Sequence, residues 1–365
     1  MKKILMICLC CMFFSMSCKA SDLVETQAEM LHTDALKRNL PEQARDLMED
    51  VEPTNISSSS VEFKSWIQKL IPSVKDLWKS ALKGTRDILL VVILCAILNV
   101  LLGDAASKAA SVAGLLGICT LCFSDFSSLI GLSKQTAQEL FDFSAILIPV
   151  LAGAATASGS ATASAVITSG TVIFLRALIW VFEKILAPAV YTSVALALAS
   201  GISGQGYLDN IRKTVEKLFK IGLKIFMFAF SAWLSVTGVL SGSADAMALK
   251  ATKMTVSTVI PVVGGMLSDA SETVLTAAGL LKNSVGAFGM LAALSIMAVP
   301  LLKLGTHYVV FQLIEFLASA VGMKVHTDFL HAVSTALANL MGIVACCGLM
   351  LFLSCVCIVK VAVPT

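Results

Sequence analysis

The sequence predicts an all-α fold: a polytopic helical membrane protein with a cleaved signal peptide and two broken or re-entrant Ile-Pro-Val segments. Of its 365 residues, 57% are hydrophobic and 14% are charged, whereas an ordinary soluble domain has about 45–50% and about 25%. The mean hydropathy is +0.87, and apolar stretches long enough to cross a bilayer recur from residue 88 to residue 359. This composition excludes a soluble globular enzyme as the default interpretation, because such a protein needs more charged groups to cover its surface.

The amino terminus, residues 1–20, has the layout of a secretory signal peptide. Two lysines precede an apolar run over residues 4–14, and small residues lead from there to Ala20. We expect cleavage near Ala20. Two alternatives stay open: lipoprotein-type cleavage at Cys18, and an uncleaved anchor, for which the apolar run is short.

Residues 21–87 form the only polar region of the sequence. They contain 12 acidic and 9 basic side chains, so the positive-inside rule does not hold them in the cytoplasm, and we expect an extracytoplasmic, mostly helical region. Within it, residues 63–78 have helical apolar spacing, with lysines around the apolar stripe. This pattern predicts either an amphipathic helix on the outer membrane face or a helix that packs against the membrane bundle.

Residues 88–365 are predicted to form a multi-span membrane domain. Its apolar segments are residues 88–102, 109–123, 143–182, 185–202, 218–241, 285–302, 308–322 and 332–359. Seven or nine spans are expected, depending on whether the small-residue stretch 143–182 crosses the membrane or re-enters it. The basic cluster of Arg212, Lys213 and Lys217 predicts a cytoplasmic loop, and an odd number of spans then places the carboxyl terminus, with Lys360, in the cytoplasm.

One short pattern occurs twice in this domain. Residues 148–153 are Ile-Pro-Val-Leu-Ala-Gly, and residues 260–265 are Ile-Pro-Val-Val-Gly-Gly. Proline removes a backbone donor and glycine permits turns, so both copies are predicted to be broken or re-entrant elements. The residues concerned are Pro149, Gly153, Pro261, Gly264 and Gly265. Interrupted segments in two halves of a chain are typical of the central site of a transporter; a chance match is the alternative.

The region around the second copy resembles a known family. Residues 249–254, Leu-Lys-Ala-Thr-Lys-Met, lead into residues 260–270 and then into Thr273-Val274 and residues 280–286. These residues are similar to the signature region of the stage III sporulation protein AE family. The likeness is specific through about residues 250–300 and extends more loosely over nearly the whole chain.

The resemblance implies a non-enzymatic integral membrane subunit of the channel or secretion-like complex that joins mother cell and forespore in endospore formers. It implies a location in the mother-cell membrane that surrounds the forespore. It also implies partners from the same complex, including a cytoplasmic ATPase, ring-forming membrane proteins and a forespore membrane protein. The alternative function is an autonomous secondary transporter, or permease, that uses the broken segments and Glu315.

Ionisable side chains at membrane depth are candidates for function, because burying them unpaired costs free energy. Glu315 lies mid-way along the 308–322 segment, and a pathway role and a structural role are equally open for it. Arg176 is a second pathway candidate; it stands seven residues before Glu183, on the same helical face, so the two could pair. The alternative for Arg176 and Glu183 is an interfacial cluster whose charged ends reach water.

Four further polar residues recur at helical spacing near the second Ile-Pro-Val copy. They are Asp269, Glu272, Lys282 and Asn283. This pattern suits an amphipathic hairpin that faces a partner or an aqueous cavity, and it equally suits a solvated face.

The sequence contains no convincing catalytic, cofactor-binding or metal-binding motif. None of its four histidines has the i, i+4 spacing and adjacent glutamate of a zinc peptidase helix, and His326 and His331 are too far apart in register to share a face. We therefore expect no enzymatic activity, no cofactor and no metal ion. The net charge of +3 forms no basic stripe, so the expected partners are the lipid bilayer and other membrane proteins rather than nucleic acid.

Overall fold

The computed structural model describes residues 20–49, 51–53, 59–101, 104–204, 206–259 and 264–360, and all regular structure within these ranges is helical. Side chains at residues 20–23, 59–64, 104–105 and 238–275 lie outside the description. The predicted signal peptide falls almost wholly outside the described residues, so its cleavage stays a prediction.

Three short helices precede the long ones. They are α2 (Ala20–Met30), α3 (Asp34–Arg38) and α4 (Glu42–Leu47). The long helices are α5 (Ser59–Leu101), α6 (Asp104–Ala157), α7 (Ala161–Val181), α8 (Ala187–Ser203), α9 (Gly206–Val259), α10 (Gly264–Ala320) and α11 (Lys324–Lys360). A π-helical turn, η1 (Phe182–Leu186), joins α7 to α8 without a loop.

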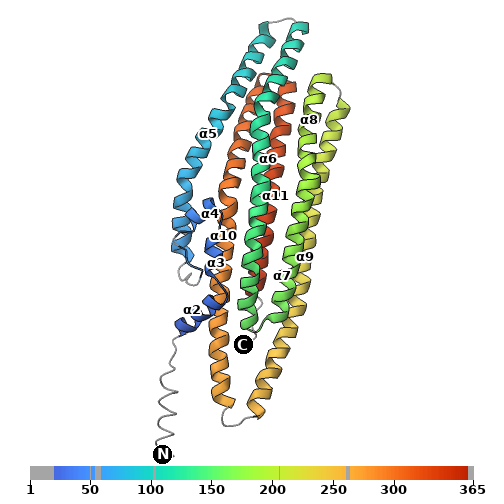
Figure 1. The fold of residues 1–365 in the computed structure, drawn as a ribbon. Helices are drawn as coiled ribbons and strands as arrows, with labels where there is room; N and C mark the ends of the chain where they lie inside the picture. Colours follow the sequence, from blue (N-terminus) through green and yellow to red (C-terminus); the bar gives the residue numbers. More distant parts are fainter. Residues whose placement is uncertain are drawn as a thin grey trace, which may run out of the picture.

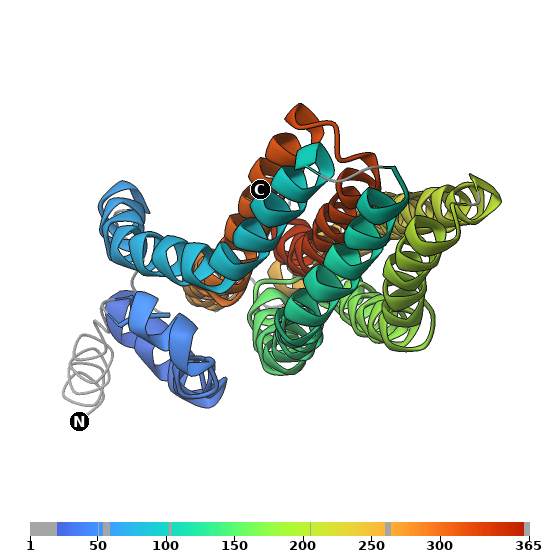
Figure 2. The same cartoon turned by 90° about the horizontal axis from the view of Figure 1, so that it is seen from above.

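Figures 1 and 2 show an elongated bundle with α6, α10 and α11 in its middle. α5 lies on one flank with the three short helices, and α7, α8 and α9 form the other flank. The middle helices approach closely at glycines: a Cβ atom at Gly289 of α10 would lie only 2.5 Å from Cδ2 of Leu147 on α6. Leu147 and Phe288 have no exposed surface, so the core is continuous across this contact.

Six helices in the described part of the chain are long and apolar enough to cross a membrane, which fits a multi-pass membrane protein. The sequence predicted seven or nine spans. The numbers differ because α6 contains the predicted segment 109–123 together with the first part of 143–182, and α10 contains 285–302 and most of 308–322. At 1.5 Å per residue, a helix as long as α6 measures roughly 80 Å, against about 30 Å of bilayer hydrocarbon. The helices therefore continue beyond a bilayer where the sequence predicted loops.

The polar stretch in the middle of α6 shows why no loop forms there. The amide of Gln135 donates to Glu139 over 2.8 Å, and the amide of Gln138 donates to Asp142 over 2.8 Å. Pairs four residues apart stabilise a helix. A stretch that hydropathy marks as a boundary between two spans is thus a good helix former.

The first Ile-Pro-Val copy is not a break in the structure. Pro149 and Gly153 both lie inside the continuous helix α6, and the chain reverses only after Ala157, where Gly159 has a φ of 92°. Ile148 and Leu151 are fully buried, so packing on both sides of Pro149 holds the helix together despite the lost hydrogen bond. Gly153 serves close packing instead, because a Cβ atom there would lie 2.7 Å from Cδ2 of Leu31.

The second copy lies largely outside the described residues. α9 ends at Val259 and α10 begins at Gly264, so Pro261 falls in the undescribed stretch between them. Gly264 and Gly265 are the first two residues of α10. A broken or re-entrant element at residues 260–263 stays a prediction.

The amphipathic segment 63–78 belongs to α5 and packs against the bundle, the second of the two alternatives that the sequence left open. The indole Nε1 of Trp66 donates to Oγ of Ser295 on α10 over 2.8 Å. Ile71 on the same segment remains 61% exposed. The segment is therefore the first part of the same helix, α5, that contains the first candidate membrane span.

The two ends of the bundle differ in which turns they carry. The α5–α6, α8–α9 and α10–α11 turns lie together at one end, while Figure 1 shows the carboxyl terminus near the other. The basic cluster around Arg212 begins at the first of these ends, and α11 runs from there to Lys360. α11 thus runs from the Arg212 end towards the opposite end of the bundle, and the side of the membrane on which the carboxyl terminus lies stays a prediction.

Candidate functional site

Glu315 is tied to the neighbouring helix by two polar contacts. Oε1 of Glu315 lies 2.9 Å from Nδ1 of His331, and Oε2 accepts a hydrogen bond of 3.2 Å from Oγ of Ser334. An ionised carboxylate only accepts, so the fitting imidazole carries its proton on Nδ1. Both partners stand on α11, and the Glu315 side chain is 19% exposed. The carboxylate therefore joins α10 to α11.

The position of Glu315 also differs from the sequence expectation. It stands five residues before the end of α10 at Ala320, about 8 Å along the helix axis, rather than in the middle of a span. Pairing near a helix end supports the structural role that the sequence left open.

A second charged cluster occupies the start of α9. Arg212 has a side chain only 4% exposed, and its Nη2 and Nη1 atoms lie 2.6 Å from Asp209 and 2.7 Å from Glu216. Oγ of Ser193 on α8 donates to the same Glu216 oxygen over 3.0 Å. Each charge in the cluster thus has a partner, as a buried charge requires, and the network fastens α9 to α8.

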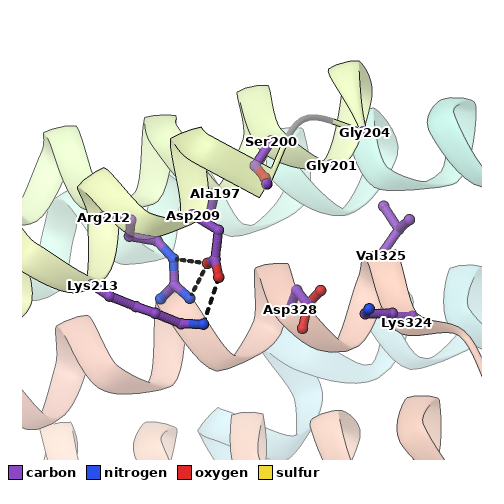
Figure 3. A pocket seen from close by; sticks show the side chains of 11 residues that line it. Ala197, Ser200, Gly201, Gly204, Asp209, Arg212, Lys213, Lys324, Val325 and Asp328 are labelled. Atoms are coloured by element: carbon purple, nitrogen blue, oxygen red, sulfur yellow. Dashed lines mark hydrogen bonds and ion pairs between the residues drawn. The ribbon is translucent and has the colours of Figure 1, made fainter.

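A cavity of about 380 Å³ opens beside this cluster. Figure 3 shows Asp209 held by Arg212 and Lys213 on one wall, with Lys324 and Asp328 projecting from α11 on the other. The wall at the α8–α9 turn is glycine-rich, and Gly204 has a φ of 67°, a conformation that favours glycine. This end of the bundle therefore combines a polar hollow with paired charges of both signs.

Arg176 lies at the surface of the bundle, and its charged end is exposed, as the interfacial alternative would have it. Its guanidinium carbon lies 5.6 Å from the ring centroid of Phe141 on α6, within reach of a cation–π contact. Among the described residues no ion pair joins Arg176 to Glu183, because η1 begins between them and changes the helical register. Arg176 is exposed, so it holds α7 to α6 at the bundle surface.

Of the four expected partner-facing residues, the two whose side chains the structure describes differ in exposure. Lys282 is 4% exposed and faces the interior of the bundle, whereas the next residue, Asn283, is exposed. Asp269 and Glu272 lie in the first turns of α10, and their side chains are outside the description. A partner-facing role for these residues stays a prediction.

Sequence reasoning missed several polar residues of this end. His331 and Ser334 are found only as partners of Glu315 across the α10–α11 contact. Glu216 is found as the partner of Arg212 one turn away on α9 and of Ser193 on α8. His326, by contrast, is 1% exposed. The His331 side chain is 51% exposed, so the two histidines lie on different faces of α11, as their five-residue spacing predicts. Within the described ranges, no group of three or more His, Cys, Asp or Glu side chains could hold a metal ion.

Comparison with known proteins gives one consistent similarity. The family model described as stage III sporulation protein AE matches residues 44–362 of this chain. Among curated proteins, the stage III sporulation protein AE of Bacillus subtilis (strain 168) is 25% identical over 353 residues, which cover 92% of this chain and 87% of that protein. No solved structure matches the chain.

Proposed function

The chain belongs to the stage III sporulation protein AE family, and from that premise we propose that it is an integral membrane subunit of the channel or secretion-like complex between mother cell and forespore. It is a multi-pass membrane protein of sporulation. In this proposal it sits in the mother-cell membrane around the forespore and works through protein partners, including an ATPase subunit and a forespore membrane protein.

The packing of the bundle core is the observation that carries this proposal. At the contact between α6 and α10, Leu147 fills the space opposite Gly289, and Leu151 lies beside Gly286. At the contact between α10 and α11, Met297 fills the space opposite Gly348. Water cannot pass through these contacts unless the side chains leave them. A transport path is therefore better placed at a surface that this chain shares with partners than inside its own bundle.

The permease alternative has less support. Its proposed coupling residue, Glu315, is held by His331 and Ser334 near a helix end, and its first helix break at Pro149 is a continuous helix.

We also propose an orientation. The end with the α8–α9 turn carries Arg212, Lys213 and Lys217, so the positive-inside rule places it in the cytoplasm. The amino-terminal helices α2 to α4 and the carboxyl end of α11 lie towards the opposite side. The carboxyl terminus is then extracytoplasmic, in contrast to the sequence expectation, because six spans return the chain to its starting side.

The experiment that tests the proposed function is a flux measurement on the purified full chain in sealed phospholipid vesicles. Uptake of amino acids, dipeptides, phosphate and monovalent cations is followed under an imposed proton gradient. We expect no flux above that of protein-free vesicles. Gradient-driven uptake that a Glu315→Gln change abolishes would establish the permease instead.

A further inference from the structure

His326 at the start of α11 presents a buried nitrogen without a partner. The side chain is 1% exposed, and its Nε2 atom makes no hydrogen bond within the described part of the chain. Nε2 points towards α6, where a Cβ atom at Gly114 would lie 3.0 Å from it. Buried polar groups nearly always have a partner. Nε2 is enclosed at the contact between α6 and α11, while the His326 side chain also borders a cavity.

His326 lines a cavity of about 690 Å³ that is rich in cations and donors. Lys108 enters it from α6 and Lys324 from α11, and the hydroxyls of Ser107 and Ser111 and the amide of Asn99 add polar groups. Its described lining contains no carboxylate; Asp209 and Asp328 line the smaller neighbouring cavity. This chemistry favours an anion with several acceptor oxygens.

A second hollow begins where the first one ends. It has a volume of about 540 Å³, lies between α5 and α10, and is lined by apolar residues alone, among them Ile93, Ile97 and Leu317. Val321 lines this apolar hollow, and Gly322, the next residue in the chain, lines the cationic cavity. On α5, Asn99 faces the cationic cavity while Val100 faces the apolar hollow. A polar site and an apolar groove thus adjoin at the α10–α11 turn.

We propose that these two hollows together bind one anionic phospholipid. The phosphate lies against Lys108 and Lys324, and an acyl chain follows the groove between α5 and α10. A free phosphate would pair with the two lysines but leave the groove uncovered, and a zwitterionic lipid would bring a third cation to a site that has two already. Cationic pockets between membrane helices are suited to such head groups. This lipid site is independent of the proposed channel role.

The first test measures lipid selectivity on the full chain purified in detergent, using native mass spectrometry with phosphatidylglycerol and phosphatidylcholine of the same acyl chains. We expect one phosphatidylglycerol to be retained in preference to phosphatidylcholine. Changing both lysines, Lys108→Gln and Lys324→Gln, should weaken its retention by roughly thirtyfold, because each lysine near an anionic lipid contributes a factor of about five.

The matched control removes two exposed lysines of α9 that line neither hollow, Lys217→Gln and Lys220→Gln. It should leave retention within twofold, and its unfolding temperature should match that of the cavity variant. Equal retention of the two lipids, or an equal loss in the two double variants, would overturn the proposal.

The second test separates a lipid from a free anion. Ala320 is an exposed residue of the apolar groove, so Ala320→Trp should fill the groove and weaken phosphatidylglycerol retention without touching the cationic cavity. Inorganic phosphate and glycerol 3-phosphate at millimolar concentration should not displace the lipid. Displacement by either anion, or full retention by the Ala320→Trp variant, would overturn the lipid assignment.

Discussion

The carboxylate of Glu315 lies 2.9 Å from Nδ1 of His331, across the contact between α10 and α11. The two residues are 16 positions apart in the chain and come together because α10 and α11 form an antiparallel pair joined by a short turn at Val321–Met323. The acidic residue that hydropathy alone marks as a transport candidate thus has a structural partner.

Glu315→Gln should preserve sporulation. Glutamine keeps an acceptor for Ser334, and His331 is 51% exposed and can bond to water, so we expect a stability loss below about 1 kcal/mol. The measurement is the count of heat-resistant spores in a strain that carries only the variant, which should stay within a few-fold of the parent. The control Ser334→Ala should behave alike. A loss of several orders of magnitude in the Gln variant alone would indicate a titrating carboxylate in a transport pathway.

Arg212→Leu should destabilise the protein strongly. The change leaves Asp209 and Glu216 without their buried cation, and breaking a buried pair costs about 3–5 kcal/mol. The measurement is the thermal unfolding of the detergent-purified protein, with the amount in membranes as a second readout. Lys213→Gln is the matched control, because the Lys213 side chain is 64% exposed and its pair contributes about 0–1 kcal/mol. Equal unfolding temperatures for the two variants would contradict the buried network.

Gly289→Ala should also destabilise, whereas Gly222→Ala should not. A methyl group at Gly289 meets Leu147 at 2.5 Å and has no room, while nothing lies within 4 Å of a Cβ at Gly222. Overpacking costs about 1–3 kcal/mol, and alanine in an open helical position gains about 0.5–1 kcal/mol over glycine. Thermal unfolding distinguishes the two. Combining Gly289→Ala with Leu147→Ala should recover part of the loss; no recovery would show that α6 and α10 do not pack as described.

The orientation is tested with fusions at the two ends of the bundle. An alkaline phosphatase fused after Lys360 should be active, because that end is extracytoplasmic, and a fluorescent protein inserted after Ser203 should fluoresce, because the basic end is in the cytoplasm. Fluorescence at the carboxyl terminus together with fluorescence at Ser203 would contradict six spans and would favour the odd number that the sequence predicted.

The sequence contains enough information for the fold class and the family but not for the helix boundaries. Hydropathy alone identifies the apolar helical segments. It also marks the stretch at Gln135–Asp142 as a boundary between spans, because a hydropathy average does not detect the side-chain pairs that stabilise one continuous helix there. Pro149 was expected to break a helix, and the buried neighbours that hold it come from other parts of the chain.

The candidate site was predictable only in part. Glu315 was identified because a lone acid in an apolar stretch is conspicuous, but its partners on α11 depend on the register between two helices. For His326, the sequence shows only that its spacing to His331 does not suit a shared metal site. Its buried, unpartnered nitrogen follows from the α10–α11 turn and from the close approach of Gly114, neither of which a single sequence shows.

The central claim is that this chain acts as a subunit of a membrane complex and not alone. The most direct measurement is affinity purification of the tagged full chain from sporulating cells in mild detergent, followed by identification of the co-purified proteins by mass spectrometry. We expect other membrane proteins of the sporulation complex and its ATPase in stable amounts, and their absence from cells harvested before sporulation. Recovery of the chain alone, from cells in which those proteins are present, would contradict the claim.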